Sequence, residues 1–560
     1  LFDGALSEPW SAGRPDSSCR IENGAMDFAA QEADAITGPS GMAIDGTAVD
    51  SLLLELGVTG TDRVSLQWRI KDNPEFEAHR IVNVYVSKPG VVVNYVIQVA
   101  GVRAFRHREI DQFRLSTPKG ARIVMKSLRV VTKRQVFSDS SLGIREFSIN
   151  NRIRPCLFMH CPGQATYEVN VPERGRFSTG LGVLKPSVPV TFRLLIREEA
   201  SEKRVWEKVV DSADDWDDVV VDFGAYSGRK ATLVLKADCG DPTQVAFWSS
   251  PVMYQPRTER KWYERGPQAP YNVIVYVIDC LRADHLDAYG YGRKTGPNIA
   301  KFGLTGARFL RHYSQETWTK PSMSTLATGV PSFVHGINAY GDVIPDSLAM
   351  LPGILRRAGY VTCAISENPH TPPDASQRRV YCYMEAVHLG VELNDPPLNW
   401  NQLPDVTFKR ASEFMESHRD APFFLYVHTM EPHDIVEKQV SDQLVYDPPD
   451  PFRHRWASRD NPKPMDFYDE CIAFADSNFK RFLDKVEDLG LRENTLIILM
   501  ADHGEAFGEH EGKMGHAGKP YNELIHIPLF VSLPGVITGR RVVDEPVQLL
   551  DIPPTILDVL

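Results

Sequence analysis

The stretch "NVIVYVID", residues 272–279, is an uninterrupted run of apolar residues that closes on an acid. Such a run is typical of a strand that is buried on both faces in a parallel sheet. Segments with helical spacing follow at 298–309 and 348–360. More apolar runs come after them, namely "VTCAIS" (361–366), "PFFLYVHT" (422–429), "TLIILMADHG" (495–504) and "IPLFVSLPG" (527–535). Strands that alternate with helices predict an α/β fold with a mostly parallel sheet flanked by helices.

The first half of the chain has a different sequence pattern. Runs rich in β-branched residues, such as "RIVMKSLRVV" (122–131), recur at short intervals and are broken by Gly, Pro and charge. Short strands with regular turn signals predict β-sandwiches, and the length suits two of them. The predicted division is a β-sandwich at 1–140, a second β-sandwich at 141–256, a Pro-rich charged linker at 257–270 and the α/β domain at 271–560.

Composition argues against two classes of protein. The chain has 62 Lys and Arg against 73 Asp and Glu, a net charge of −11, and no basic block stands out. This balance argues against a nucleic-acid binder. No window of about eighteen apolar residues exists, so we expect no transmembrane segment. The chain starts at Leu1 instead of Met, so a signal peptide or an upstream region can be missing from it.

Two features of the first half leave alternatives open. The motif "CLFMHC", residues 156–161, is a conceivable metal site, but buried thiols or a local disulfide are the favoured interpretation. The stretch that begins "WDDVVVDFGAY", at 216, is similar to the last strands of carbohydrate-binding jelly rolls. Trp216 or Trp248 could stack on a sugar ring, whereas a place in the core is favoured for both.

Acidic and His residues follow three of the predicted strands. Asp279 closes the first run, Asp502 and His503 follow "TLIILMA", and His428 and His433 come at the end of "PFFLYV". In open α/β sheets ligands bind outside the carboxyl ends of the strands, where an unpaired buried carboxylate is costly. Each residue alone could be a cap or half of an ion pair. Together, Asp279, Asp502 and His503 predict a site for one divalent ion, Ca²⁺ or, because of the His ligand, Mn²⁺ or Zn²⁺.

The segment "SQETWTKPSMSTLATG", residues 314–329, gathers small hydroxyls just before a predicted helix. Pro321 is predicted at the first helical position, where Pro is favoured. One of the hydroxyls either caps the helix or acts as a nucleophile beside the ion, where helix N–H groups can bind an anionic substrate.

Five blocks carry a family resemblance, and they are "YNVIVYVIDCLRADHLDAYGYGRKTGPNIAKF", "TWTKPSMSTLATGVPSFVHG", "FFLYVHTMEPHD", "ADHGEAFGEHEGKMGHAGKPYNELIHIPLFV" and "LLDIPPTILDVL". Together and in this order, the blocks between 271 and 560 resemble the sulfatase family of the alkaline phosphatase superfamily. The resemblance implies an alkaline-phosphatase-like central sheet, one divalent metal ion and a covalent ester intermediate.

The resemblance also implies roles for single residues. Asp279 matches the first metal aspartate, and Asp502 and His503 match the second pair of ligands. Thr319 takes the place of the nucleophile. His433, in "EPH", matches the substrate-side histidine.

Three further residues are assigned to the mouth of the site. His516 falls where relatives place a His or Lys near the leaving group, and Lys513 lies close enough in sequence to compete for that role. Asn368 follows the strand "VTCAIS" and is expected to touch substrate. Glu505, Glu509, His510 and Glu511 are candidates for a layer behind the ligands.

The departures from the family pattern bear on the chemistry. Typical sulfatases have Cys or Ser at the nucleophile and Arg four residues later, a signal read by the machinery that makes formylglycine. Here the two positions hold Thr319 and Met323. Cys280 stands where many sulfatases have a second metal aspartate. Thr cannot become the formylglycine aldehyde, so its own hydroxyl must attack. A phosphorylated Thr is a tractable intermediate, whereas water would hardly attack the sulfur of a sulfated Thr.

The main hypothesis is therefore a metal-dependent sulfatase-family hydrolase that cleaves sulfate or phosphate esters, on glycan- or lipid-linked substrates, through a covalent Thr319 intermediate. One alternative is a transferase of the phosphoglycerol or phosphoethanolamine type that acts on a glycan acceptor. Another is a catalytically silent glycan-binding protein. The resemblance implies work outside the cytoplasm, in the periplasm or after secretion. The chain stops at "DIPPTILDVL", before the usual C-terminal part of the fold.

Overall fold

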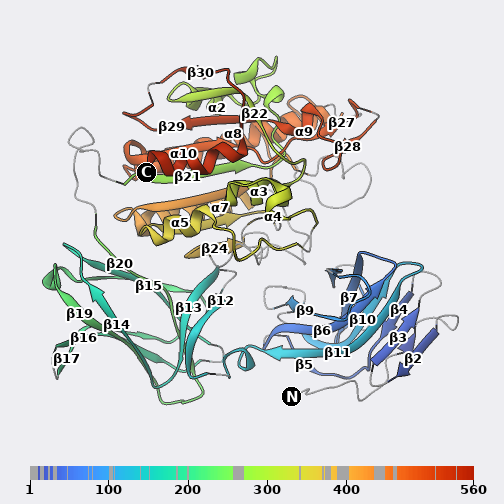
Figure 1. Ribbon diagram of the computed structural model, residues 1–560, viewed down its shortest axis with the longest axis vertical. Helices are drawn as coiled ribbons and strands as arrows, with labels where there is room; N and C mark the ends of the chain where they lie inside the picture. Colours follow the sequence, from blue (N-terminus) through green and yellow to red (C-terminus); the bar gives the residue numbers. More distant parts are fainter. Residues whose placement is uncertain are drawn as a thin grey trace.

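The computed structural model describes most of residues 11–256 and 270–560. Its longer undescribed segments are 13–17, 30–33, 100–104, 372–379, 387–402, 434–447 and 458–462, with short gaps elsewhere. The predicted linker lies outside the described residues except for Pro270. Figure 1 shows an α/β part with the two β-rich parts on one side of it. Among the described helices, none combines the length and the apolar character that a membrane crossing needs.

The first β-sandwich has two antiparallel sheets whose inner faces share one apolar core. Trp68 and Phe113 are fully buried in that core. One sheet contains β1 (Ser11–Ala12), β4 (Asp34–Thr37), β5 (Ile44–Asp45), β7 (Arg63–Ile70), β8 (Ile81–Tyr85) and β10 (Glu109–Thr117). The other contains β2 (Ser18–Glu22), β3 (Ala25–Ala29), β6 (Val49–Thr59), β9 (Val93–Gln98) and β11 (Arg122–Thr132).

The second β-sandwich follows a short 3₁₀ helix, η1 (Gln135–Phe137). One sheet contains β14 (Gly163–Asn170), β16 (Val190–Glu198), β17 (Ser201–Val210) and β19 (Lys230–Asp238). The facing strands are β12 (Leu142–Ile149), β13 (Arg152–His160), β15 (Arg176–Val183), β18 (Asp217–Asp222) and β20 (Val245–Tyr254). Alternating apolar residues on both inner faces explain why these segments pack as a sandwich.

The aromatic and thiol residues of this sandwich belong to its interior. Trp216 is 5% exposed and Trp248 is 0% exposed, so neither offers a face to a sugar ring. Trp216 Nε1 donates to the carbonyl of Arg152 at 2.8 Å. Cys156 and Cys161 are buried in two different apolar clusters, so they form neither a local disulfide nor a metal site with each other. The core positions favoured for both Trp residues and the buried thiols are thus confirmed, whereas the local disulfide is wrong.

The α/β part is built on a sheet whose middle strands are parallel. They are β24 (Tyr383–Ala386), β23 (Val361–Ser366), β25 (Phe423–Thr429), β21 (Asn272–Ile278) and β26 (Thr495–Met500), in spatial order. The sheet continues through β29 (His526–Ser532), β22 (Ala307–Tyr313), β30 (Arg541–Val543) and β31 (Val547–Gln548), and β29 runs antiparallel to β26. All residues of β21 are buried, as its apolar run predicts.

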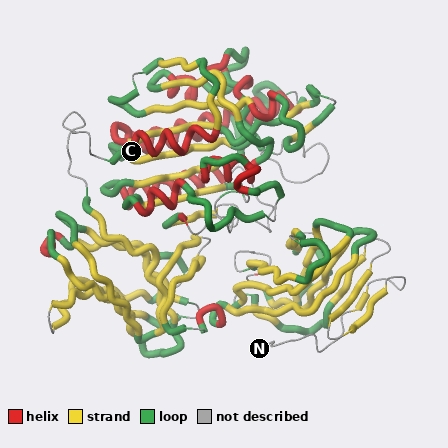
Figure 2. Tube along the Cα trace, viewed as in Figure 1, coloured by secondary structure: helices red, strands yellow, loops and turns green. Residues whose placement is uncertain are grey.

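Helices form one layer on each side of this sheet (Figures 1 and 2). One layer contains α2 (Pro297–Gly303), α7 (Leu403–His418) and α8 (Pro464–Asp488), and α8 contacts both of the others. The other contains α3 (Thr319–Thr328), α4 (Ser332–His335), α5 (Leu351–Arg357) and α10 (Ile552–Val559). The short α9 (Asn522–Ile525) leads into β29. These two layers bury the faces of the sheet that the sequence predicts to be apolar.

The predicted helix over 298–309 is wrong in its second half. Helix α2 ends at Gly303, and β22 begins at Ala307. The backbone at Gly306 passes so close to β29 that a Cβ there would lie 2.2 Å from the carbonyl oxygen of Val531. Close strand pairing at this Gly therefore overrides the helical pattern.

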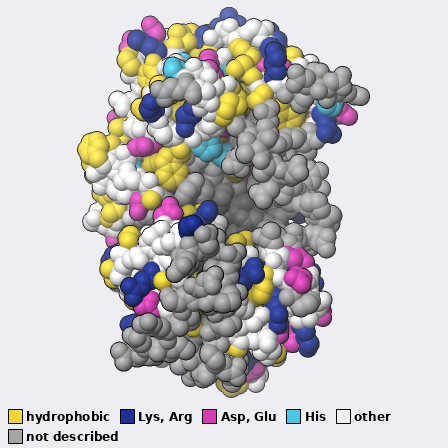
Figure 3. All heavy atoms as spheres, turned by 90° about the vertical axis from the view of Figure 1, so that its right-hand side faces the viewer, with side chains coloured by type: hydrophobic (Ala, Val, Ile, Leu, Met, Phe, Trp, Pro, Cys, Tyr) yellow, Lys and Arg dark blue, Asp and Glu magenta, His cyan; other side chains and the backbone are white. Residues whose placement is uncertain are grey.

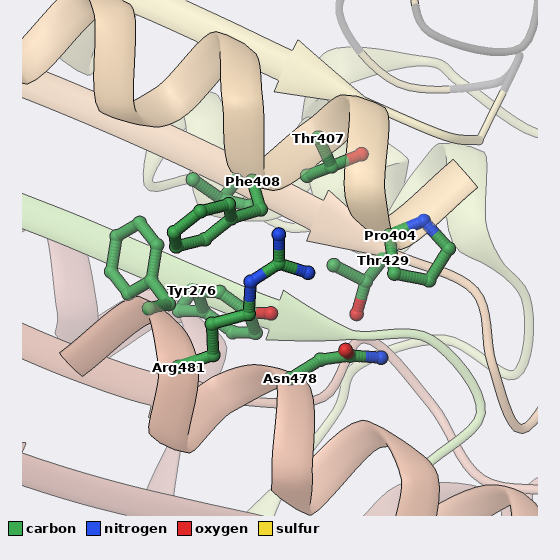
Figure 4. A pocket seen from close by; sticks show the side chains of 9 residues that line it. Tyr276, Pro404, Thr407, Phe408, Thr429, Asn478 and Arg481 are labelled. Atoms are coloured by element: carbon green, nitrogen blue, oxygen red, sulfur yellow. The ribbon is translucent and has the colours of Figure 1, made fainter. Parts of the chain in front are cut away.

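A small cavity lies between α7 and α8, at the side of β21 and β25 (Figure 4). Tyr276, Thr407, Thr429 and Asn478 line it, and the Arg481 guanidinium lies 3.8 Å from the ring centre of Phe408. Its volume is ≈ 10 Å³, which is enough for about one water molecule. This cavity is too small to receive a substrate.

The sheet of the α/β part does not end at β24. Strand β13 of the second sandwich pairs antiparallel with β24, through Arg152 with Glu385 and Ile153 with Met384. One hydrogen-bonded sheet therefore runs from the second sandwich through the α/β part. The pairing covers the edge of β24, which would otherwise expose unpaired backbone groups.

Arg154 provides a test of this junction. Its side chain is 3% exposed, donates to Asp218 Oδ2 at 3.0 Å, and lies 4.7 Å from the ring centre of Tyr383 in β24. We expect Arg154→Ala to lower the free energy of unfolding by about 1–3 kcal/mol, because it leaves Asp218 without its main partner and removes packing on β24. Urea unfolding followed by tryptophan fluorescence measures the change.

The matched control is Arg193→Ala in the same sandwich. Arg193 pairs with Glu207 and Asp238 and is 31% exposed, so its loss should cost about 1 kcal/mol or less. Equal losses for the two variants would contradict a specific role of Arg154 at the junction.

Candidate functional site

The carboxyl ends of the middle strands meet at one edge of the sheet. Because β21 runs parallel to β25 and β26, the residues that follow these strands come together there. Asp279 directly follows β21, and Asp502 and His503 follow β26. His503 Nε2 lies 3.6 Å from Asp279 Oδ1 and 3.3 Å from Asp502 Oδ2. The structure thus places the three predicted metal ligands around a common point.

In each of the two carboxylates, one oxygen accepts hydrogen bonds that hold the group in place, and the other oxygen has no such partner among the described residues. Asp279 Oδ2 accepts from Asn368 Nδ2 at 2.6 Å and lies 3.0 Å from His428 Nε2. Asp502 Oδ1 accepts from the backbone N–H groups of Cys280 and His503, at 3.2 and 2.8 Å. Asp279 Oδ1 and Asp502 Oδ2 are fully buried and have no hydrogen-bond partner among the described residues.

These two oxygens and His503 Nε2 fit a divalent cation. His503 Nδ1 lies 2.9 Å from the carbonyl of Gly504 and can only donate to it, which leaves the lone pair on Nε2. Burial lowers the pKa of His503, which favours the neutral ring that binds metals. Ligand distances of about 2.0–2.2 Å from one ion would separate the donor atoms by about 3–3.5 Å, close to what is found. Buried carboxylate oxygens without a partner are costly, so a cation is the natural occupant.

The charge balance of Asp279 agrees with this arrangement. Burial opposes the ionised form of Asp279, but His433, His428 and His503 outweigh burial and hold its pKa well below the usual value. The carboxylate is therefore ionised at neutral pH and available as a ligand.

Thr319 lies at the start of α3, with its side chain in the centre. Thr319 is 3% exposed, and its Oγ1 lies 3.1 Å from His503 Nε2 and 3.3 Å from Asn368 Nδ2. The N-cap position is Trp318, and no side chain makes a capping hydrogen bond at this helix end. The Thr319 hydroxyl therefore faces the candidate ion site and does not cap the helix.

The predicted start of this helix is wrong by two residues. Helix α3 begins at Thr319, so Pro321 is the third helical residue and not the first. Pro is tolerated there because N–H groups in the first turn have no acceptor within the helix. The earlier start puts Thr319 on the helix itself.

Asn368 is expected at the mouth of the site, but the structure places it in the buried centre. It is 1% exposed, and its amide joins Asp279 to Thr319. His428 plays a similar part and was not assigned from sequence. Its Nδ1 lies 2.6 Å from the hydroxyl of Tyr426. A His inside an otherwise apolar strand is the sequence signal that could have identified this role.

His433 and His516 form the open side of the centre. Their rings lie 4.9 Å apart, and the His516 ring lies 4.7 Å from that of His503. The side chains are 12% and 24% exposed, and Figure 3 shows His side chains reaching the surface of the α/β half. His433 Nε2 is 4.0 Å from Asp279 Oδ1.

Glu505 sets the protonation of His516. Its Oε2 lies 3.2 Å from His516 Nδ1. Burial disfavours the charged ring, but Glu505 outweighs burial and raises the pKa of His516. His516 can therefore carry a proton near neutral pH. Lys513 Nζ donates to the backbone carbonyl of His516 at 3.5 Å.

The other candidates for the layer behind the ligands have separate roles. Glu509 pairs with the buried Arg282, which also donates to the carbonyl of Glu505 at 2.9 Å. His510 pairs with Glu523 at 2.6 Å, away from the centre. Glu511 lies outside the described residues. Arg282 and Glu509 thus position the loop that carries Glu505.

Arg293 and Lys294, in a turn after β21, do not reach the centre. Arg293 pairs with Asp466 and Asp469 of α8 at 2.7 Å each. The Lys294 side chain is 75% exposed. Arg293 is thus anchored to α8, and Lys294 is largely exposed to solvent.

Known families provide an independent comparison. A family model described as Sulfatase matches residues 271–560, which is half of the chain. The chain belongs to the sulfatase family. The family match covers the α/β part only, and it ends with the last residue of the chain.

Members of the sulfatase family among characterised proteins are distant. An arylsulfatase of Clostridium perfringens is 22% identical over 363 residues, covering 51% of this chain and 74% of the relative. The N-acetylgalactosamine-6-sulfatase of Homo sapiens is 23% identical over 339 residues, covering 51% of this chain and 61% of the relative. The chain therefore spans less than two thirds of the human sulfatase.

Solved structures that align with the chain do so at low similarity. A 2-O GAG sulfatase aligns with 52% of this chain and 70% of its own, at 19% identity and a TM-score of 0.42. The phosphonate monoester hydrolase of Agrobacterium radiobacter aligns with 51% of this chain and 73% of its own, at 21% identity and a TM-score of 0.39.

Proposed function

We propose that the chain is a metal-dependent ester hydrolase in which Thr319 is the nucleophile. The observation that carries the proposal is the position of Thr319 Oγ1, 3.1 Å from His503 Nε2 and beside two buried carboxylates. A divalent ion held by Asp279, Asp502 and His503 would lower the pKa of this hydroxyl and neutralise charge on the reacting ester. Asn368 and His428 hold Asp279 in place for this purpose.

The proposed reaction has two steps. The Thr319 hydroxyl loses its proton to solvent, and its oxygen forms a bond to phosphorus or sulfur while the ester bond to the leaving oxygen breaks. The leaving oxygen takes a proton from His516, whose pKa Glu505 raises. Water then attacks the phosphorus and gives a proton to His516, while the bond to Thr319 breaks. The Thr319 oxygen regains a proton from solvent, and the phosphate product is released. His433, close to Asp279, would contact the transferred group.

The nucleophile favours phosphate esters over sulfate esters. A sulfatase with formylglycine releases sulfate through its aldehyde, and Thr319 cannot form an aldehyde. The place of the Arg in the formylglycine signal is taken by Met323, which is 2% exposed and packs in the core. Phosphothreonine can be hydrolysed at phosphorus, so a phosphoryl group suits this site better.

The substrate class is proposed from the relatives. The human relative is named for a sulfated amino sugar, so a glycan-linked anionic ester is the proposed substrate. Another relative, from Haloferax volcanii, is 24% identical and is named a glycan biosynthesis sulfotransferase. Transfer to a glycan acceptor is therefore the second candidate reaction. A location outside the cytoplasm rests on the family resemblance alone.

The test is a panel of small aryl esters, namely a sulfate, a phosphate monoester, a phosphodiester and a phosphonate, with Mn²⁺, Zn²⁺ or Ca²⁺ added back. We expect the best phosphoryl substrate to exceed the sulfate by at least about 100-fold in kcat/KM, because only the phosphorylated Thr turns over readily. Equal or faster sulfate turnover would contradict the phosphoryl preference. Turnover that needs an added glycan acceptor would favour the transferase.

A further inference from the structure

Two free thiols lie on facing segments at one end of the second sandwich. Strands β14 and β19 pair antiparallel, and Gly163 lies opposite Ala237 at the end of their ladder (Figure 1). The same register, carried two residues further, puts Cys161 opposite Cys239. Both residues have free thiols. Neither the family match, which begins at residue 271, nor the proposed reaction gives these thiols a role.

Both thiols face the interior of the sandwich. Side chains two residues apart on a strand lie on the same face of the sheet. Ala165 of β14 and Ala237 of β19 are buried in the apolar core between the two sheets. Cys161 belongs to that same core, and Cys239 packs against it. The two cysteines are therefore on the same face, as a cross-strand bond between them requires.

The loop from β19 to β20 holds the two cysteines together in a second way. The N–H of Cys161 donates to the carbonyl of Gln244 at 3.0 Å, and the N–H of Gln244 donates to the carbonyl of Asp241 at 3.1 Å. The Cys239 thiol donates to the same Asp241 carbonyl at 3.1 Å. Gln244 is 2% exposed, and its side-chain amide donates to the carbonyl of Leu184 at 2.9 Å. The loop that begins at Cys239 is thus anchored beside Cys161.

The two thiols differ in reactivity. Burial raises the pKa of the Cys161 thiol, and the neighbouring Cys239 thiol raises it further. Since the thiolate is the reactive form, Cys161 attacks slowly. Cys239 is only partly buried, so a small oxidant in solution can reach its sulfur first.

The spacing of a cross-strand pair suits a disulfide. Residues directly opposite each other in an antiparallel pair have Cα atoms about 4.5–5.5 Å apart. Disulfides span Cα separations of about 4.4–6.8 Å, so such a pair can be bridged without a large movement of the backbone. Cys156, which is near Cys161 in sequence, is buried in a different apolar cluster. Among the described residues, neither Cys161 nor Cys239 belongs to a group of three metal-ligand side chains, which favours a disulfide over a metal site.

We propose that Cys161 and Cys239 form a disulfide in the presence of a small disulfide oxidant such as glutathione disulfide. The Cys239 thiolate attacks one sulfur of the oxidant, and one glutathione leaves as a thiol. The Cys161 thiolate then attacks the Cys239 sulfur, and the second glutathione leaves. The two protein thiols are oxidised, the oxidant is reduced, and the two thiol protons end on the two glutathione molecules. The bond would persist in an oxidising compartment, such as the proposed location outside the cytoplasm.

The disulfide would join the two sheets of the sandwich. Cys161 follows β13 of one sheet, and Cys239 follows β19 of the other. The chain between them contains all strands from β14 to β19, so the bond closes a long loop. Closing a long loop lowers the entropy of the unfolded chain and thereby stabilises the folded one. This inference concerns the sandwich, so it stands whether or not the chain hydrolyses phosphate esters.

Incubation of the full chain with glutathione disulfide tests the proposal. After the remaining thiols are alkylated in denaturant, peptide mapping by mass spectrometry should find Cys161 and Cys239 joined in the wild type. The melting temperature of the oxidised protein should exceed that of the protein reduced with dithiothreitol by about 5 °C or more. Cys239→Ala should show neither the joined peptides nor this difference in melting temperature.

The matched control is Cys156→Ala, which removes another buried thiol of the same sandwich. This variant should keep both the joined peptides and the difference in melting temperature. Alkylation of both Cys161 and Cys239 after equilibration of the wild type with the oxidant would overturn the proposal. So would a lasting glutathione adduct on Cys239, or a bond from either residue to another cysteine. Peptide mapping of the wild type decides the question even if a variant fails to fold.

Discussion

Thr319→Ala is expected to lower turnover of the best ester substrate by about 10⁴-fold while leaving the fold and the bound ion intact, because the covalent route is lost. Its Oγ1 is the hydroxyl that faces His503 and Asn368 in the centre. Thr319→Ser keeps a hydroxyl at this place and should retain most of the activity. Steady-state kinetics on the three proteins, with metal content measured in parallel, check the expectation.

Ser324→Ala is the matched control for this experiment. Ser324 lies on the same helix, and its hydroxyl donates to the backbone carbonyl of Lys320 at 2.8 Å. Its loss should change turnover by less than about 10-fold. A slow phosphodiester should leave one phosphoryl mass on the peptide that holds Thr319. An adduct on Ser322 or Ser324, or a fully active Thr319→Ala, would reject Thr319 as the nucleophile.

Asp502→Ala is expected to release the ion. Loss of a residue that only supports a ligand costs about 10–100-fold in metal affinity, so loss of a direct ligand should exceed about 100-fold. Asp502 Oδ2 is buried and has no hydrogen-bond partner among the described residues, as expected of an oxygen that binds an ion. Elemental analysis should find about one divalent ion fewer per chain than in the wild type, and added Mn²⁺ should no longer raise the melting temperature.

The control for this second experiment is Asp284→Ala. Asp284 is a 56% exposed carboxylate that pairs with Arg282 and lies outside the proposed ligand set. It should keep the ion and the metal-dependent rise in melting temperature. An Asp502→Ala protein with wild-type metal content would contradict the assignment of the ion site.

Much of the site follows from strand ends that the sequence makes visible. Asp279 and the pair Asp502 and His503 each follow an apolar run, and parallel pairing of β21 with β26 brings them together. These ligands could be predicted from local sequence patterns because each of them lies next to its strand. The α/β fold and the two preceding β-sandwiches were predictable for the same reason, since alternation and spacing are local properties.

Other features depend on contacts that no local pattern records. The pairing of β13 with β24 joins residues more than two hundred positions apart, and neither strand carries a sign of its partner. The support of His516 by Glu505 depends on how one loop folds back. The start of α3 at Thr319 was also missed, because Pro321 suggested the first helical position more strongly than the hydroxyl residue before it.

The shared sheet between the second sandwich and the α/β part has a consequence for long substrates. A hinge motion between β13 and β24 would have to break the backbone hydrogen bonds that join them. This pairing therefore restricts rotation of the second sandwich relative to the α/β part. A polymeric substrate bound at the second sandwich would lie at a constant distance and direction from Thr319. Cleavage at a fixed spacing along such a polymer would then be favoured over cleavage at random positions.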